Sequence, residues 1–291
     1  MKRNVLFLIL IASAILFGEE WVARYNGPAD SGDYARAIAV DSQGNVYVTG
    51  ASYGQGTDYD YATIKYSPDG EELWVRRYNG PGNGRDDARA IAVDNQGNVY
   101  VTGKSFGGAT DYDCVTIKYS PDGEELWVRR YDGRYIGRMI NTNDLAYAIA
   151  VDNQGNVYVT GAAHDTFNLR PRRAVFDYAT IKYGPNGETL WVRRYNGPFR
   201  HDDAQAIAVH NDNVYVTGWS EGLNTSYDYA TIKYSSVGIK EEKVREKILF
   251  TPYKAKEVYD ITGKRIKDLR RIKKGIYFFK DKYFKKVIIL N

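Results

Sequence analysis

The sequence predicts an all-β fold built from four similar units, and three observations lead to this prediction. Composition favours strands and tight turns, because 26 Tyr and 28 Gly stand against only two Met in 291 residues. Apolar residues alternate with polar ones or form short runs, and long stretches of helical period are absent. A set of motifs also recurs four times along the chain. Apolar residues make up 43% of the sequence, which is enough to bury a full-sized core.

Four motifs define the repeat and recur in a fixed order. The motif Trp-Val-(Ala/Arg)-Arg-Tyr starts at Trp21, Trp74, Trp127 and Trp191. The motif Ala-Ile-Ala-Val starts at Ala37, Ala90, Ala148 and Ala206. The motif Tyr-Val-Thr-Gly ends at Gly50, Gly103, Gly161 and Gly218, and Thr-Ile-Lys-Tyr ends at Tyr66, Tyr119, Tyr183 and Tyr234. The copies are therefore four versions of one structural unit.

Each copy contains four predicted strands. In the first copy, residues 37–40 are small and apolar, as in a strand covered on both faces, and a turn with Gly44 follows. Residues 46–49 and 61–66 then alternate as strands, and Ser-Pro-Asp-Gly supplies a turn. Residues 71–78 are the most polar and so the outermost. Four antiparallel strands in about 50 residues are the size of a propeller blade.

The ends of the repeat region predict how the blades close. The chain starts with an extra fourth strand, Trp21–Tyr25, whereas the last copy ends after Tyr234 without one. Pairing of the first segment with the last blade would leave no free sheet edge there. We therefore predict a four-bladed β-propeller closed by the N-terminal strand, with a larger ring of two chains as the alternative.

The repeat resembles a known family. The sequence Asp-(Ser/Asn)-Gln-Gly-Asn-Val-Tyr-Val-Thr-Gly, followed by Asp-Tyr-Ala-Thr-Ile-Lys-Tyr-Ser-Pro-Asp-Gly-Glu-Glu-Leu-Trp, is similar to the bacterial SBBP β-propeller repeat over residues 21–234. The fourth copy departs from this pattern at 210–213, where the first turn is one residue short, and at 235–238. The resemblance implies an extracellular or surface location more than a reaction.

The N-terminus predicts a signal peptide over residues 1–18. Lys2 and Arg3 precede an uncharged run from Val5 to Phe17, which is shorter than the ~20 residues that span a bilayer. A buried N-terminal strand or helix is the alternative. No other stretch is long and apolar enough to cross a membrane, so we expect no integral membrane segment after cleavage. The expected location is secreted or on the outer cell surface.

A change in charge marks a second unit. Residues 240–291 carry 17 Lys and Arg against 7 Asp and Glu, whereas the rest of the chain carries 23 against 29. This predicts a propeller over 19–238 and a C-terminal domain over 239–291. Short apolar clusters separated by turns predict a small β-sandwich there. The basic residues alternate with strand formers, so nucleic-acid binding is not expected.

The C-terminal unit also resembles a known domain. Val-Tyr-Asp-Ile-Thr-Gly-Lys-Arg-Ile, Gly-Ile-Tyr-Phe-Phe and Lys-Lys-Val-Ile-Ile-Leu, over 258–290, are similar to the C-terminal sorting domain of type IX secretion substrates. The resemblance implies that outer-membrane secretion machinery is a partner, followed by release or attachment at the cell surface. A plain accessory β domain is the alternative.

Positions that differ between copies predict a ligand surface. The loops after the fourth strand and between the second and third strands should open on one face of a propeller. One aspartate per copy lies there and could form a ring that holds Ca²⁺, or could cap its own loop. These aspartates are Asp33, Asp86, Asp144 and Asp202. Three residues further on, Arg36, Arg89, Tyr147 and Gln205 are the candidate ligand-binding residues.

Few residues suggest catalysis. Asp58 with Asp60, and Asp111 with Asp113, could form glycosidase pairs, but the later copies lack the pattern. The sequence has three His and one Cys, and no metal, nucleophile or phosphate-loop motif. We therefore predict an exported, non-enzymatic binding or scaffold module for a glycan or protein ligand, without a cofactor. The alternatives are a carbohydrate-active enzyme using carboxylates and a structural surface protein that binds nothing small.

Overall fold

The computed structural model describes residues 20–108, 111–133, 143–164, 175–211, 213–222 and 225–235, and the backbone of four strands beyond them. The chain divides into two units, Met1–Gly238 and Ile239–Asn291. The predicted signal peptide, residues 1–18, lies outside the described residues. Within the described part of the chain, no helix is long and apolar enough to cross a membrane.

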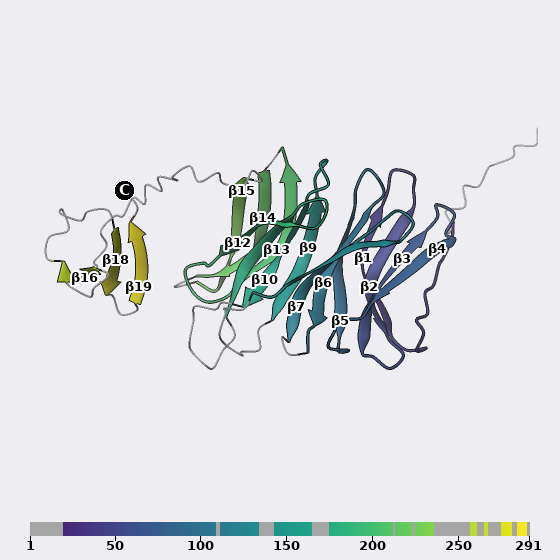
Figure 1. Ribbon diagram of the computed structural model, residues 1–291, viewed down its shortest axis with the longest axis horizontal. Helices are drawn as coiled ribbons and strands as arrows, with labels where there is room; N and C mark the ends of the chain where they lie inside the picture. Colours follow the sequence, from purple (N-terminus) through teal and green to yellow (C-terminus); the bar gives the residue numbers. More distant parts are fainter. Residues whose placement is uncertain are drawn as a thin grey trace, which may run out of the picture. The chain divides into compact units, whose positions relative to one another are not determined.

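The described residues of the first unit form 15 strands in four antiparallel sheets, whose arrangement Figure 1 shows. In each sheet the strands follow one another in chain order, so each sheet is a meander. We call the sheets blades 1 to 4 and the first strand of each blade its inner strand. Blade 1 is β1(Asp33–Val40), β2(Val46–Tyr53), β3(Tyr59–Tyr66) and β4(Glu72–Tyr78). Blade 2 is β5(Asp86–Val93), β6(Val99–Phe106), β7(Tyr112–Tyr119) and β8(Glu125–Tyr131). Blade 3 is β9(Asp144–Val151), β10(Val157–His164), β11(Phe176–Tyr183) and β12(Thr189–Tyr195), and blade 4 is β13(Asp202–His210), β14(Asn213–Glu221) and β15(Tyr227–Ser235).

The turn after the inner strand explains one repeated motif. Asp41 Oδ1 accepts the backbone N–H groups of Gln43 and Asn45 at 2.8 and 2.9 Å. Its other oxygen accepts the hydroxyl of Tyr47 at 2.9 Å, which ties the turn to β2. Gly44 has a φ of 83°, a backbone conformation that residues with a side chain rarely adopt. Asp94 and Asp152 form the same bonds in the next two copies.

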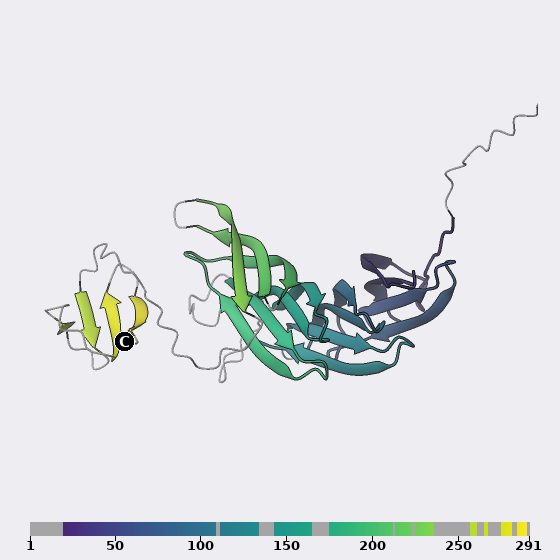
Figure 2. The same ribbon diagram turned by 90° about the horizontal axis from the view of Figure 1, so that it is seen from above.

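The core lies between the blades. One face of blades 1, 2 and 3 presents a Trp and one or two Tyr side chains, and these pack on apolar strand residues of the next blade. Between blades 1 and 2, Tyr47, Tyr61 and Trp74 meet Val99, Val101 and Ile117, all 8% exposed or less. The inner strands β1, β5, β9 and β13 contact one another in sequence. Figure 2 shows the blades side by side along an open arc.

The expected pairing of Trp21–Tyr25 with the last blade is not formed. This segment is not a strand, and blade 4 contains three strands. The segment instead lies on blade 1, where the Trp21 indole donates to Pro68 O at 3.0 Å. Ala23 and Tyr25 pack there against Ile64 and its neighbours. The prediction of closure by hydrogen bonds was therefore wrong, because these apolar contacts hold the segment on the face of blade 1.

The second unit contains one sheet. Its strand order is β17-β16-β18-β19, and all neighbours are antiparallel. The strands are β16(Glu257–Asp260), β17(Arg265–Ile266), β18(Gly275–Lys280) and β19(Phe284–Ile289). The described residues give a single sheet and no second layer, so the predicted β-sandwich is not formed by them.

Candidate ligand-binding site

The first residue of each inner strand is an aspartate that caps the preceding loop. Asp33 Oδ2 accepts the backbone N–H of Gly27 at 2.9 Å. The other three aspartates accept a glycine N–H at 2.6 to 2.7 Å in the same way: Asp86 from Gly80, Asp144 from Gly133 and Asp202 from Gly197. In the described part of the chain these four carboxylates do not gather into one group. Cation binding by the four together stays a prediction.

The four candidate ligand-binding residues share a backbone feature that the sequence does not reveal. Each is the fourth residue of its inner strand, and each is skipped by the pairing with the second strand. In blade 1, Ala35 pairs with Gly50 and Ala37 with Thr49. The same shift leaves out Arg36, Arg89, Tyr147 and Gln205. These residues are therefore β-bulges, which turn side chains out of the regular pleat and are common beside binding sites.

Two of the bulge residues meet on one carboxylate. Arg36 Nε lies 3.2 Å from Asp87 Oδ1, and Arg89 Nη2 lies 3.2 Å from Asp87 Oδ2. A third guanidinium, from Arg85, lies 3.7 Å from Oδ2. The Asp87 side chain is 1% exposed, whereas the three arginines are 35% to 37% exposed. We call these four residues the arginine cluster.

Aromatic rings and a lysine extend the arginine cluster. The Arg85 guanidinium lies 4.7 Å from the ring centre of Tyr59, and Lys104 Nζ lies 4.3 Å from that of Tyr112. Burial lowers the pKa of Lys104, and nearby Arg89 and Arg85 lower it further against the opposing effect of Asp87. Asp111 and Asp58 add negative charge near Tyr112. The region therefore combines cations with ring faces.

The other two bulge residues meet a second carboxylate. Burial raises the pKa of Asp203 to about 6, against the lowering effect of a hydrogen bond from Gln205. Burial also raises the pKa of Tyr147 to about 12, with Asp203 raising it and Arg89 lowering it. Tyr147 is thus close enough to both Asp203 and Arg89 for their charges to shift its pKa. The four predicted residues thus hold equivalent positions on neighbouring inner strands, and Asp87 contacts two of them directly.

The sequence analysis missed the two linking aspartates. Both occupy the second position of their inner strands, where the other copies have Tyr34 and Leu145. This position differs between copies as the fourth position does, and residues two apart on a strand lie on one face. The signal was therefore present in the sequence. Arg85 and Lys104, which come from a loop and from β6, could be placed only by the structure.

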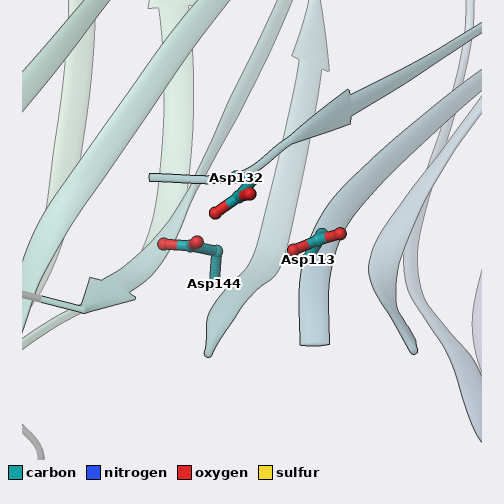
Figure 3. A group of neighbouring side chains, drawn as sticks. All are labelled: Asp113, Asp132 and Asp144. Atoms are coloured by element: carbon teal, nitrogen blue, oxygen red, sulfur yellow. The ribbon is translucent and has the colours of Figure 1, made fainter. Parts of the chain in front are cut away.

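A second group of polar residues lies between blades 2 and 3. Asp113 is on β7, Asp132 follows β8 and Asp144 begins β9, as Figure 3 shows. One carboxylate oxygen of each lies within 4.8 Å of the others. Asp113 and Asp144 are 0% exposed. Such a group could hold a hard cation, which takes oxygen ligands.

Asp144→Asn is expected to stabilise the first unit at pH 8 by roughly 1–4 kcal/mol. Burial raises the pKa of Asp144 from 3.8 to about 7, so the folded state binds the proton more tightly than the unfolded state. Its contribution to stability is complete below about pH 4 and is lost as the pH rises through about 7. The amide still accepts the Gly133 N–H and carries no charge.

Urea unfolding at pH 5 and pH 8 measures this effect. Asp132→Asn is the matched comparison, because it gives this copy the Asn found at positions 79 and 196 and removes only a neighbouring charge. We expect it to act in the same direction and more weakly. An advantage of Asp144→Asn that does not grow with pH would contradict the assignment.

The cysteine is buried, and two of the histidines lie beside one aromatic ring. Cys114 is buried among the residues between blades 2 and 3, and burial raises its pKa to about 12, so it stays a thiol. The ring centres of His164 and His201 lie 6.0 and 6.2 Å from that of Phe176. His210 lies at the opposite end of β13, beside the turn to β14.

Comparisons with known proteins support the repeat. Three stretches, residues 20–56, 73–108 and 133–166, match the β-propeller repeat family SBBP. An uncharacterized WD repeat-containing protein of Acanthamoeba polyphaga mimivirus is 26% identical to 46% of this chain. That match covers 11% of the viral protein, so the chain spans about a tenth of its length. The chain therefore contains β-propeller repeats of the SBBP type.

Solved structures with similar sheets come from several classes of protein. An α-L-arabinofuranosidase of Clostridium thermocellum has a TM-score of 0.38 at 14% identity, covering 69% of this chain and 68% of that one. A β-xylosidase/α-arabinofuranosidase from a compost metagenome has a TM-score of 0.38 at 13% identity, covering 68% and 73%. An apocarotenoid oxygenase of Synechocystis has a TM-score of 0.38 at 10% identity, covering 69% and 49%. Similarity at this level says nothing about the activity of this chain.

Proposed function

We propose that the chain is a non-enzymatic binding module that binds an acidic glycan at the arginine cluster. The observation that carries this proposal is the convergence of Arg36, Arg85 and Arg89 on the single carboxylate of Asp87. The three arginine side chains are 35% to 37% exposed, so a ligand can reach the guanidinium groups from solvent.

The balance of donors and acceptors supports an anionic ligand. A guanidinium offers five N–H donors, whereas one carboxylate has about four acceptor positions. The three arginines therefore keep many donors that Asp87 cannot satisfy. Carboxylate and sulfate groups match the forked geometry of a guanidinium and form two parallel hydrogen bonds with it. Acidic glycans carry carboxylate or sulfate groups on every ring or on every second ring of the chain.

The neighbouring rings support a sugar as the remainder of the ligand. Tyr34 and Tyr59 lie with ring centres 5.7 Å apart, and a hydrogen bond between their hydroxyls raises the pKa of Tyr59. Tyr34 is 49% exposed and Tyr53 is 37% exposed. Exposed ring faces beside convergent polar groups are typical of ligand sites. A sugar ring could lie on these faces while its acid group reaches the arginines.

One observation favours a carbohydrate-active enzyme as the second candidate. Burial raises the pKa of Asp144, which lies beside Asp113 and Asp132, and a glycosidase uses a pair of carboxyl groups of which the acid has a raised pKa. Burial counts against it, since Asp113 and Asp144 are 0% exposed and a glycan cannot reach them. The binding function is therefore the better supported of the two.

We also propose that the chain is exported to the cell surface or the medium. The basic and apolar N-terminal residues support a signal peptide, and the resemblance of residues 258–290 to a sorting domain supports recognition by outer-membrane secretion machinery. Immunoblots of cell fractions and medium test this. An intact chain confined to the cytoplasm would overturn it.

Removing two arginines is expected to abolish most of the binding. On an array of acidic and neutral oligosaccharides, the wild-type chain should bind acidic members, and Arg36→Ala/Arg89→Ala should bind them at least tenfold more weakly. Each lost charge-assisted bond is worth about 1.5–3 kcal/mol. Arg24→Ala is the matched control, because Arg24 is exposed and is not one of the arginines paired with Asp87.

The same array separates the alternatives. Equal binding by the wild type and the double variant would contradict the proposed site. Release of sugar products from bound glycans, lost in Asp144→Asn, would favour the enzyme. Silence on all glycans with retention of a protein ligand would favour a protein-binding module.

A further inference from the structure

We propose that two copies of this chain form one closed ring of eight blades, in which the N-terminal segment of each copy completes the last blade of the other. The proposal is independent of the ligand. It starts from the contact between successive blades, which the chain forms three times with nearly constant geometry.

The repeated contact has two recognisable parts. The indole of Trp74 donates to Pro121 O at 3.0 Å, and that of Trp127 donates to Pro185 O at 3.1 Å. The Trp ring also lies on a Tyr of the next blade. The ring centres are 6.2, 6.0 and 6.2 Å apart for Trp74–Tyr119, Trp127–Tyr183 and Trp191–Tyr234. Each blade is therefore placed on the next in the same way.

Blade 1 already carries part of a fourth such contact. The Trp21 indole donates to Pro68 O at 3.0 Å, and its ring centre lies 6.2 Å from that of Tyr66. The indole bond to a proline oxygen matches the first two contacts, and the ring distance matches all three. Trp21–Tyr25 thus occupies the place of the outer strand of a preceding blade, and the rest of that blade is not supplied by this copy.

The space for the preceding blade is open. A cavity of about 270 Å³ lies beside this segment and is lined by Ala23, Val46, Val48, Ile64 and other apolar residues of blade 1. The corresponding residues of blade 2 receive Tyr47 and Tyr61 from blade 1. The cavity therefore has the position and the apolar lining for two tyrosines from another blade.

Blade 4 presents those two tyrosines without a partner blade. Tyr215 corresponds to Tyr47, and Tyr229 corresponds to Tyr61, in the repeat. Tyr47 and Tyr61 are 0% and 1% exposed, whereas Tyr215 and Tyr229 are 37% and 97% exposed. Among the described residues, β15 is also the edge of a three-stranded sheet and has no outer neighbour such as β4 is for β3. The two ends of the chain are therefore complementary halves of one interface.

The two ends of one copy do not meet. In a closed four-bladed ring, each blade is rotated by the same angle from the one before it, and blade 4 contacts blade 1 in the same way as the other neighbours. Here the three contacts between blades are nearly equal, and they leave Tyr229 of blade 4 exposed. Among the described residues, β1 and β13 do not pack on each other as consecutive inner strands do. Figure 2 shows the two blades at opposite ends of the arc. The rotation from one blade to the next is therefore too small to close a ring of four blades.

A second copy closes the ring with the smallest number of chains. Propellers usually contain four to eight blades, so two copies reach the upper end of that range and three would exceed it. Head-to-tail contacts between identical chains form a closed ring when the rotations between chains add up to a full turn. For two chains, each is related to the other by a two-fold axis. By analogy with β3 and β4, Thr231 of one copy would pair with Ala23 of the other, because Thr63 pairs with Arg76.

A disulfide between these positions tests the proposal in the full chain. In Ala23→Cys/Thr231→Cys, the Cα atoms of paired residues would lie within the 4.4–6.8 Å that a disulfide allows. We expect a covalent dimer on non-reducing gels that returns to the monomer after reduction. The single variants Ala23→Cys and Thr231→Cys serve as controls and should run as monomers on the same gels, because neither can form the disulfide between these two positions.

Two other results would overturn the proposal. A monomer with an internal disulfide would show closure of a four-bladed ring within one chain, and two free thiols would show that the ends do not meet. Light scattering of the unmodified chain should give twice the mass of one chain. Tyr229→Asp should halve this mass, whereas Leu73→Asp, which alters an exposed residue of β4 outside the interface, should not.

Discussion

Gly161→Ala is expected to destabilise the first unit by about 2–4 kcal/mol. A Cβ atom at Gly161 would lie 1.9 Å from the backbone oxygen of Leu145 on the inner strand β9. The oxygen belongs to a paired strand and cannot move without disturbing the bulge at Tyr147. Urea unfolding followed by tryptophan fluorescence measures the loss.

Gly56→Ala is the control for this substitution. Gly56 has a φ of 86° and no atom within 4 Å of an added Cβ. Gly56→Ala reports the cost of an unfavourable backbone conformation alone, which is roughly 1–2 kcal/mol. If both variants lost the same stability, close approach of the strands would not be the reason for the glycine. The same glycine in blade 2, Gly103, lies against the backbone oxygen of Asp87.

Arg130→Leu is expected to cost about 3–5 kcal/mol, because it leaves a buried carboxylate without its cation. Arg130 Nη1 lies 2.6 Å from Asp113 Oδ2, and the side chains are 23% and 0% exposed. Arg130 also donates to Ser105 Oγ at 2.7 Å and so joins β8 to β6. Thermal unfolding should show a clear fall in Tm.

Two further variants show whether the buried charge is the cause. Arg36→Leu removes a guanidinium 3.2 Å from Asp87, but Arg85 and Arg89 remain to compensate that carboxylate. We expect a loss below about 1 kcal/mol. Adding Asp113→Asn to Arg130→Leu should recover part of the lost stability, because the uncompensated charge is removed. No recovery would assign the loss to packing instead.

The sequence predicted the elements of each blade because their causes are local. Turns are set by Asp41 and Gly44, and strands by alternation, so both recur with the motif. The angle between blades depends on how neighbouring sheets pack, so it cannot be predicted from the sequence of a single repeat. This is why closure by Trp21–Tyr25 could not be judged from the sequence.

The candidate site was predictable in part. Arg36 and Arg89 were found because they differ between otherwise equal copies, and the structure places both on Asp87. The bulge that turns them out of the pleat has no sequence signature of its own. The group of Asp113, Asp132 and Asp144 is assembled across two blades, so no spacing along the chain could reveal it.

Titration calorimetry with a matched pair of ligands tests the central claim most directly. The pair is a galacturonate oligosaccharide and its methyl ester, which keep the same rings and differ in charge. The arginine cluster predicts that the acid binds and that the ester binds at least tenfold more weakly, with the affinity for the acid falling as salt is added. Equal affinity for the acid and the ester would contradict recognition by Arg36, Arg85 and Arg89.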